Sequence, residues 1–301
     1  MSILVVDIGG SFIKYAVMED DNSILSRGKI PTPRGSRLEL VEALSGLYNA
    51  NGPVEGLAIS MPGIIDSARG YCAMGGALRY NDDFFLADAL AEYIPVPIYM
   101  ENDAKCAAMA EASVGSLKDA ANGLVLVFGT MVGSGIIIDH KLYKGSRFSA
   151  GEVSYIIPEV DLEPGFDNVW GNSCGTPRLC RMYAEKKGLS PINVTGEVVF
   201  EALHGGDVVA EESLRQYTRE IAVQIFSLHN ILDPELIAIG GGISAQPLFI
   251  EFIRQNLELL YEQCPFKLPH ARIVPCAFLS DANLIGALQC YLRARQEAER
   301  T

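Results

Sequence analysis

The chain has 301 residues, of which 49% are hydrophobic and 20% charged, with a formal net charge of −13. Two hydrophobic cores fit this length, and the acidic balance argues against a nucleic-acid surface. No apolar run is long enough for a membrane span, and the start of the chain has no pattern of a signal peptide. The seven cysteines are scattered and odd in number, as in reduced proteins. We therefore expect a cytoplasmic enzyme.

The first candidate site lies between two apolar segments near the N-terminus. Residues 3–6 form an apolar run that ends at Asp7, two glycines follow, and residues 15–18 are apolar again, which predicts a β-hairpin. Backbone N–H groups, a hydroxyl and a lysine in its turn could receive phosphate oxygens. Asp7 could hold Mg2+ through its water shell. The alternative is an ordinary tight hairpin with a capping aspartate. The predicted phosphate ligands are Gly9, Gly10, Ser11 and Lys14.

The rest of the first half alternates strands with helices, which indicates an α/β fold. Strands are expected at residues 24–30, 57–60 and 97–100, and helices at 38–51, 84–93 and 104–114, whereas residues 70–83 show little periodicity. Asp103 follows the last of these strands, where open α/β sheets place ligands. It could accept the proton of an attacking hydroxyl in a phosphoryl transfer. The alternative is that Asp103 or Asn102 is only a helix N-cap.

The second half repeats the strand–loop–strand pattern. Residues 124–139 hold Gly129, Thr130 and Gly133 between two apolar segments, and a strand at 236–239 runs into a loop of three glycines, Gly240, Gly241 and Gly242. A further strand is expected at 272–276, and helices at 177–187, 196–204, 208–232, 248–261 and 282–294. Neither a dinucleotide fingerprint nor a P-loop is present. The two similar hairpins predict a duplicated domain that holds a nucleotide between its copies, as in the sugar kinase, Hsp70 and actin ATPase superfamily.

A second carboxylate, Glu152, lies in the stretch Ala150-Gly151-Glu152-Val153-Ser154-Tyr155. Carboxylates and amides that bracket hydroxyl groups are what a sugar site needs. The alternative is a solvated loop charge, which is common for a single glutamate. The four histidines are dispersed and lack the spacing of metal ligands.

Six stretches in order resemble the ROK family of bacterial sugar kinases and related repressors. They are the hairpin at Asp7, Glu101-Asn102-Asp103-Ala104, the run from Gly129 to Ile138, Lys141-Leu142-Tyr143-Lys144-Gly145 with Ala150-Gly151-Glu152, the Gly240–Gly242 loop, and residues 281–287. The resemblance covers nearly the whole chain. It implies a two-domain actin-like ATPase fold, with duplicated mixed sheets flanked by helices. We place a smaller domain at residues 1–117 plus 283–301 and a larger one at 118–282.

The resemblance also implies an activity and its residues. The activity is ATP-dependent phosphorylation of a hexose or hexoside hydroxyl, usually O6, with Mg2+, in a homodimer. Asp103 corresponds to the general base, and Asn102 and Glu152 correspond to sugar-binding residues. Tyr155 and Gly76 complete the expected sugar contacts.

The sequence departs from the family at the zinc ligands. Members with structural zinc carry Gly-Glu-x-x-His and then Cys-x-Cys-Gly-x-x-Gly-Cys. Here Tyr155 stands at the histidine, and Asn172, Cys174 and Leu179 stand at the cysteines. One ligand of four remains, so no zinc site is expected. Zinc-free members include proteins similar to β-glucoside kinases and some N-acetylmannosamine kinases. A β-glucoside or glucose-like substrate is favoured, and N-acetylmannosamine is the alternative.

Two functions of other classes fit the sequence less well. A sugar-responsive repressor would carry a DNA-binding module ahead of the first hairpin, and Asp7 already belongs to that hairpin. A catalytically silent sugar sensor would not need Asp7, Lys14 and Asp103 together. We therefore predict a sugar kinase that binds ATP and a small-molecule sugar, with neither nucleic acid nor membrane as a partner.

Overall fold

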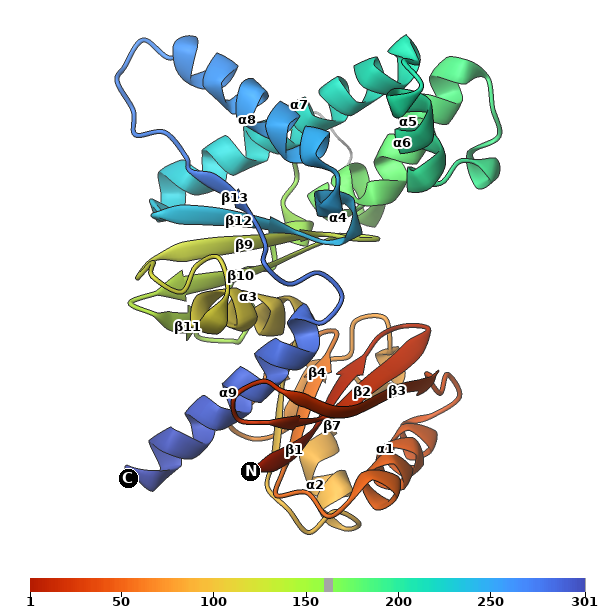
Figure 1. The fold of residues 1–301 in the computed structure, drawn as a ribbon, viewed down its shortest axis with the longest axis vertical. Helices are drawn as coiled ribbons and strands as arrows, with labels where there is room; N and C mark the ends of the chain where they lie inside the picture. The colour runs from red at the N-terminus through yellow and green to blue at the C-terminus, as the bar shows by residue number, and fades with distance from the viewer. Residues whose placement is uncertain (160–164, 301) are drawn as a thin grey trace. The chain divides into compact units, whose positions relative to one another are not determined.

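The computed structural model describes residues 1–159 and 165–300 (Figure 1). It divides into two compact units. The first unit consists of Met1–Val114, Leu142–Ala150 and the C-terminal stretch from Ser280, and the second consists of Gly115–Lys141 and Gly151–Leu279. The short segment Leu142–Ala150 therefore packs with the first unit, although the chain on either side of it belongs to the second.

The sheet of the first unit has the strand order β3-β2-β1-β4-β8. Strands β1 (Ser2–Ile8), β2 (Phe12–Glu19) and β3 (Ile24–Pro31) pair antiparallel, which confirms the predicted hairpin. Strand β1 also pairs in parallel with β4 (Leu57–Met61), and β4 pairs in parallel with β8 (Ile98–Asn102). The almost unbroken burial of β1 is typical of a strand that is covered on both faces.

Helices cover both faces of this sheet. Helices α1 (Arg37–Asn51) and α2 (Leu86–Ala91) share one hydrophobic core with alternate residues of β1 (Figure 1). Helices α3 (Asp103–Val114) and α9 (Ala282–Glu299) pack against each other. A small second sheet holds β5 (Ile64–Asp66), β6 (Tyr71–Met74) and β7 (Phe84–Phe85). The helix expected at 84–93 was thus wrong at its start, because its first two residues pair with β6.

The sheet of the second unit repeats the first. Its order is β11-β10-β9-β12-β13, with bounds β9 (Gly123–Phe128), β10 (Val132–Ile138), β11 (Lys141–Tyr143), β12 (Leu236–Gly240) and β13 (Ile273–Pro275). Strands β9 and β10 are antiparallel, and β9, β12 and β13 are parallel. These senses match β1–β2 and β1–β4–β8 in the first unit. The predicted duplication of mixed sheets is confirmed.

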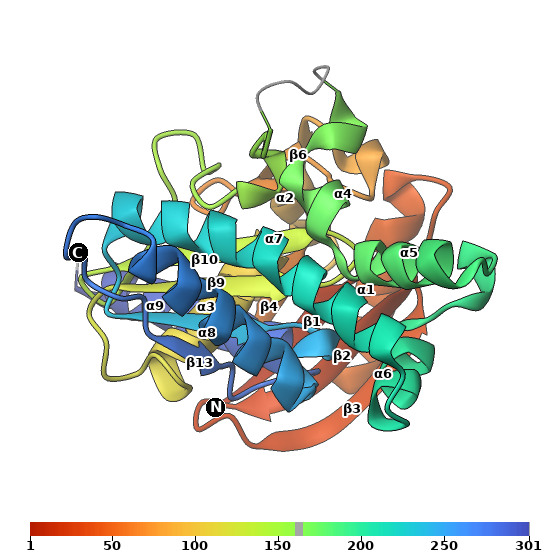
Figure 2. The ribbon, with the colours of Figure 1, turned by 90° about the horizontal axis from the view of Figure 1, so that it is seen from above.

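Helices of the second unit are α4 (Trp170–Cys174), α5 (Thr176–Lys187), α6 (Gly196–His204), α7 (Val208–Leu232) and α8 (Pro247–Glu262). Helices α7 and α8 lie side by side over the sheet of this unit (Figures 1 and 2). Their apolar faces enter the core formed with β9 and β12. Among the described residues, no helix combines the length and apolarity that a bilayer crossing would need. All seven cysteines are free thiols.

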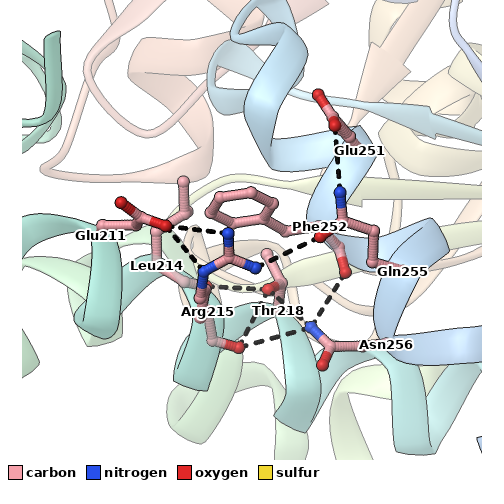
Figure 3. Close-up of polar contacts among 8 residues, drawn as sticks. All are labelled: Glu211, Leu214, Arg215, Thr218, Glu251, Phe252, Gln255 and Asn256. Carbon is pink, nitrogen blue, oxygen red and sulfur yellow. Dashed lines mark hydrogen bonds and ion pairs between the residues drawn. The ribbon is translucent and has the colours of Figure 1, made fainter. Parts of the chain in front are cut away.

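A polar cluster at the edge of that core fixes how α7 meets α8 (Figure 3). The Arg215 guanidinium lies 4.0 Å from the ring centroid of Phe252 and donates to Glu211 at 2.8 Å and to Gln255 at 3.2 Å. Asn256 donates to the Thr218 hydroxyl at 3.0 Å. These contacts join two helices that cover the same sheet.

The close approach of α3 and α9 depends on one glycine. A Cβ atom on Gly286 would lie 1.7 Å from the backbone oxygen of Cys106. Real Cβ atoms do not come so close, so the two helix backbones can pack at this distance only where no side chain intervenes.

Replacing this glycine therefore tests the helix packing. Gly286→Ala should destabilise the protein by roughly 1–3 kcal/mol, the usual range for overpacking. The matched control is Gly46→Ala in α1, where an added Cβ would meet no atom within 4 Å. Because alanine is the better helix former, that change should stabilise by up to roughly 1 kcal/mol. Urea unfolding measures both, and equal stabilities of the two variants would contradict the packing described.

Candidate active site

The first glycine turn is braced from one side. Gly9 donates its N–H to the oxygen of Phe12 at 3.0 Å, and the Thr32 hydroxyl donates to the oxygen of Gly9 at 2.6 Å. The Arg34 guanidinium donates to the oxygen of Gly10 at 3.2 Å. Gly10 and Ser11 themselves are exposed. The turn is therefore rigid on its inner side and open on its outer side, as a phosphate loop requires.

Asp7 is the second-last residue of β1, just before this turn. Its Oδ1 atom accepts hydrogen bonds from the Ser60 hydroxyl at 2.9 Å and from the Asn283 amide at 3.0 Å. Lys14, on β2, donates to the oxygen of Ser280 at 3.4 Å. The last segment of the chain thus fixes the hairpin of the first, through both Asn283 and Ser280.

A magnesium ion at Asp7 would be held mostly by water. The described residues contain no group of three or more histidines, cysteines, aspartates or glutamates placed to hold a metal. Mg2+ commonly keeps several waters and binds one or two carboxylates together with substrate phosphates. A single aspartate behind a phosphate loop fits that pattern.

Asp103 and Asn102 have different local roles. The Asn102 side chain accepts the N–H of Lys105 at 3.0 Å, so Asn102 caps α3, and it donates to the oxygen of Gly63 at 2.9 Å. Asn102 is buried, whereas Asp103 is partly exposed and accepts the N–H of Ala104 at 2.8 Å. The cap is therefore supplied without the carboxylate of Asp103.

The second glycine hairpin meets the start of α5. Gly129 donates to the oxygen of Met131 at 2.9 Å, and its own oxygen accepts the N–H of Thr176 at 2.8 Å. The triple-glycine loop reaches the same place, because a Cβ atom on Gly241 would lie 2.1 Å from the oxygen of Phe128. Gly241 has φ +92, a backbone conformation that favours glycine. The structure thus brings together two stretches that are far apart in the sequence.

A cavity of about 500 Å³ opens beside this hairpin. Its volume lies in the range of small-molecule sites. Its wall combines two residues of the second glycine hairpin, the first turns of α5 and a short apolar segment; the residues are Gly129, Thr130, Thr176, Pro177, Cys180, Arg181, Pro191, Ile192 and Val194. The sequence pattern had not singled out the last seven of these, which come from segments with no glycine-loop pattern.

Glu152 follows a tightly held glycine. Gly151 has φ +84, and its oxygen accepts the Ser134 hydroxyl at 2.5 Å. The Ser154 hydroxyl donates to the oxygen of Val132 at 2.5 Å. Two serines therefore tie this segment to β10, and Glu152 lies between the tied positions. Tyr155, next in the segment, has 47% of its surface exposed. Gly76, in the first unit, has φ +58.

The residues at the zinc positions do not fit a zinc ion. Leu179 is fully buried in the apolar core, and the Asn172 amide donates to the oxygen of Phe166 at 2.7 Å. Burial raises the pKa of the Cys174 thiol to about 12. Of the four zinc positions, only Cys174 therefore keeps a side chain of a type that commonly binds zinc.

Several supporting residues were missed by the sequence analysis. They are Arg34, Ser60 and Thr32 around the first turn, and Thr176 behind the second. Each acts through a contact that is distant in the chain, and none belongs to a glycine-rich stretch. Asn283 does lie in a stretch that resembles the family, and that stretch was a usable signal.

A family model described as "ROK family" matches residues 3–294. The chain belongs to the ROK family. A β-glucoside kinase of Klebsiella pneumoniae is 35% identical to this ROK protein over 262 residues, which cover 85% of this chain and 87% of that relative. A ROK family protein from Streptococcus pneumoniae, solved with sucrose, has a TM-score of 0.89 at 28% identity and covers 99% of this chain and 100% of its own.

A third similar protein is a ROK family glucokinase from Streptomyces griseus, solved with glucose and AMPPNP. Its TM-score is 0.84 at 25% identity, over 96% of this chain and 99% of that one. These comparisons confirm the predicted family, the actin-like fold and the enzyme class, an ATP-dependent carbohydrate kinase.

The first turn can be tested with a side chain that fits the protein but crowds a phosphate. The nearest atom to a Cβ on Gly10 would be 3.9 Å away, so Gly10→Val should fold normally. The KM for ATP should rise about tenfold to a hundredfold, since a hydrogen bond to a charged group contributes roughly 1.5–3 kcal/mol. Sugar affinity, measured by calorimetry without ATP, is the control. An equal fall in sugar affinity would make this turn a structural feature of the ROK protein and not a phosphate site.

Metal content is a separate test. Because the residues at the zinc positions are buried, apolar or hydrogen-bonded elsewhere, the purified ROK protein should hold no stoichiometric zinc after dialysis. Elemental analysis measures this directly. One tightly held zinc per chain would show that other side chains have replaced the family ligands.

Proposed function

We propose that the chain is a sugar kinase that transfers the γ-phosphoryl group of ATP to the O6 hydroxyl of a hexose or hexoside. The observation that carries this proposal is Asp103, a partly exposed carboxylate at the carboxyl end of β8 whose helix is capped by another residue, Asn102. A carboxylate at this position could accept the proton of an attacking hydroxyl as a general base. A β-glucoside or glucose-like substrate is favoured, in line with the Klebsiella relative.

We assign the nucleoside of ATP to the cavity beside the second hairpin. Pro177, Ile192 and Val194 offer apolar surface for a base, and Gly129 and Thr130 form its phosphate end. The N-terminus of α5 adds the positive end of a helix dipole there, which favours an anion. The AMPPNP in the Streptomyces glucokinase supports ATP as the phosphoryl donor.

The remaining phosphate contacts are assigned to the glycine loops. Gly9, Gly10, Ser11 and Lys14 of the first hairpin, Gly133 of the second, and the triple-glycine loop would bind the β- and γ-phosphates. Asp7 would hold Mg2+ through water. When bound, that ion would neutralise charge on the phosphates.

Sugar recognition is assigned to Asn102, Glu152, Tyr155 and Gly76. Asn102 is held by its hydrogen bond to the oxygen of Gly63, and Gly151, which precedes Glu152, is held by Ser134. Fixing these positions limits the entropy lost on binding. The exposed Tyr155 could stack on a sugar ring or its aglycone. We also propose, from the family resemblance, that the enzyme is a cytoplasmic homodimer. N-acetylmannosamine is the alternative substrate.

In the proposed reaction, Asp103 accepts the hydroxyl proton as the sugar oxygen attacks the γ-phosphorus. The bond from that phosphorus to the bridging oxygen of ADP breaks, and the proton remains on the carboxylate until release. The phosphoryl group passes through a loose transition state, so positioning and charge stabilisation supply most of the rate. The glycine loops and Lys14 would provide both.

Asp103→Asn tests whether Asp103 is the general base without disturbing the fold. It keeps the shape and leaves the Asn102 cap in place, but it removes the proton acceptor. Since general-base catalysis contributes roughly 10² to 10⁴ in rate, kcat should fall by that factor while the sugar Kd changes little. The matched control is Asp207→Asn at the start of α7, where the carboxylate bonds Lys187 and Val209. It should lower stability without lowering kcat.

Steady-state kinetics and calorimetry measure these quantities. An Asp103→Asn enzyme that keeps more than about a tenth of wild-type kcat would exclude Asp103 as the base, because that loss is below the range expected.

A further inference from the structure

An ion pair between a buried carboxylate and a partly buried lysine lies next to the proposed base in the chain. The Glu101 carboxylate is 1% exposed, and its Oε2 atom is 2.6 Å from the Lys144 ammonium. The Ser67 hydroxyl donates to the same oxygen at 2.8 Å, and the N–H of Asn102 donates to Oε1 at 3.0 Å. Glu101 immediately precedes Asn102 and Asp103. Its fixed carboxylate therefore holds the chain just before these two residues.

The Lys144 ammonium makes further hydrogen bonds to residues around Glu101. It donates to the Ser67 hydroxyl at 2.9 Å and to the Tyr99 hydroxyl at 3.2 Å. Burial raises the pKa of the Tyr99 phenol, so it keeps its proton. A buried charge is costly unless paired and hydrogen-bonded. Here both partners meet that condition, so the cluster holds one geometry.

Lys144 also fixes a turn of the chain that leads to the other proposed sugar ligand. Its backbone oxygen accepts the N–H of Ala150 at 3.0 Å. This hydrogen bond joins the two ends of the loop 144–150. Gly145, with φ +72, lets Ala150 approach. The chain then enters Gly151, which Ser134 holds, and reaches Glu152. Lys144 is thus bound to Glu101 through its side chain and to Ala150 through its backbone, and Glu152 follows Ala150 by two residues in the chain.

We propose that Glu101 and Lys144 are positioning residues for the proposed site residues that follow each of them in the chain: Asn102 and the base Asp103 after Glu101, and Glu152 after Lys144. This inference rests on the proposed function, because it needs those groups to contact the sugar. Glu101 is not a second base, because its carboxylate is enclosed and already bound to an ammonium.

A structural role alone would predict something different. Replacing a buried ion pair by uncharged groups is often neutral or stabilising, whereas removing one partner is strongly destabilising. If the pair served stability only, a variant without both charges would recover stability and kinetics together. If the pair sets positions, stability recovers but the sugar kinetics do not.

The experiment compares Lys144→Met, the double variant Glu101→Gln with Lys144→Met, and the control Lys187→Met. The control removes an ion pair of similar length, 2.7 Å to Asp207, from α5. Unfolding midpoints, KM for sugar, KM for ATP and kcat are measured with the sugar that gives the highest wild-type turnover. Sugar Kd is measured by calorimetry without ATP, which does not require turnover.

For the double variant we expect near wild-type stability with sugar KM raised about tenfold or more, kcat lowered by a similar factor, and ATP KM within about twofold, because small misplacements near a site cost rate. Lys187→Met should keep all kinetic constants. A stable double variant with wild-type sugar KM, kcat and Kd would overturn the inference and leave the kinase assignment intact. A double variant that does not regain stability would also overturn it. Wild-type protein without turnover on any sugar would overturn the proposed function and this inference with it.

Discussion

Parallel pairing of β1, β4 and β8 is the constraint on which the first unit depends. The register aligns Asp7 with Ser60 and Ser60 with Glu101. Because parallel strands end at the same sheet edge, the residues that follow them collect there. The Asp7 carboxylate, the Asn102 cap and Asp103 are thereby brought to one edge without any special sequence between them. Burial of β1 on both faces leaves the register little freedom to shift.

The second unit has the same parallel strand pairing, but different residues follow its strands. There Gly129 follows β9 and Gly240 ends β12, where the first unit has carboxylates. Gly241 approaches the backbone of Phe128 more closely than any side chain would allow. Both units therefore place a glycine turn at the end of a strand, and the first unit adds carboxylates. In the proposed function, these groups would be the cradle for anions and the proton acceptor that a phosphoryl transfer needs.

Periodic and glycine-rich stretches were predictable from the sequence. Both hairpins and the long helix α7 follow from strong apolar patterns, and α7 was predicted at its observed bounds. The small sheet β5–β6–β7 was missed because its strands have two to four residues, too few to show alternation. The contacts of Glu101 with Lys144 were missed for another reason. They join residues distant in sequence, and no local pattern reports such a pair.

The segment Leu142–Ala150 packs with the first unit, although the chain on either side of it belongs to the second. The ion pair of Lys144 with Glu101 joins this segment to β8, and no local sequence pattern predicts such a contact. The zinc positions could be assessed from the sequence alone, because the replacement of one histidine and two cysteines is visible in the residue identities.

Turnover of the wild-type protein tests the central claim most directly. The protein would be incubated with Mg-ATP and, in turn, glucose, cellobiose, N-acetylmannosamine, mannose and fructose. ADP release would be followed by a coupled assay and the product by phosphorus NMR. The account predicts sugar-dependent ADP release, highest with glucose or cellobiose, and a phosphate on O6. A sugar that binds by calorimetry but gives no ADP release above the background with ATP alone, for every sugar tried, would contradict it and identify a sensor instead.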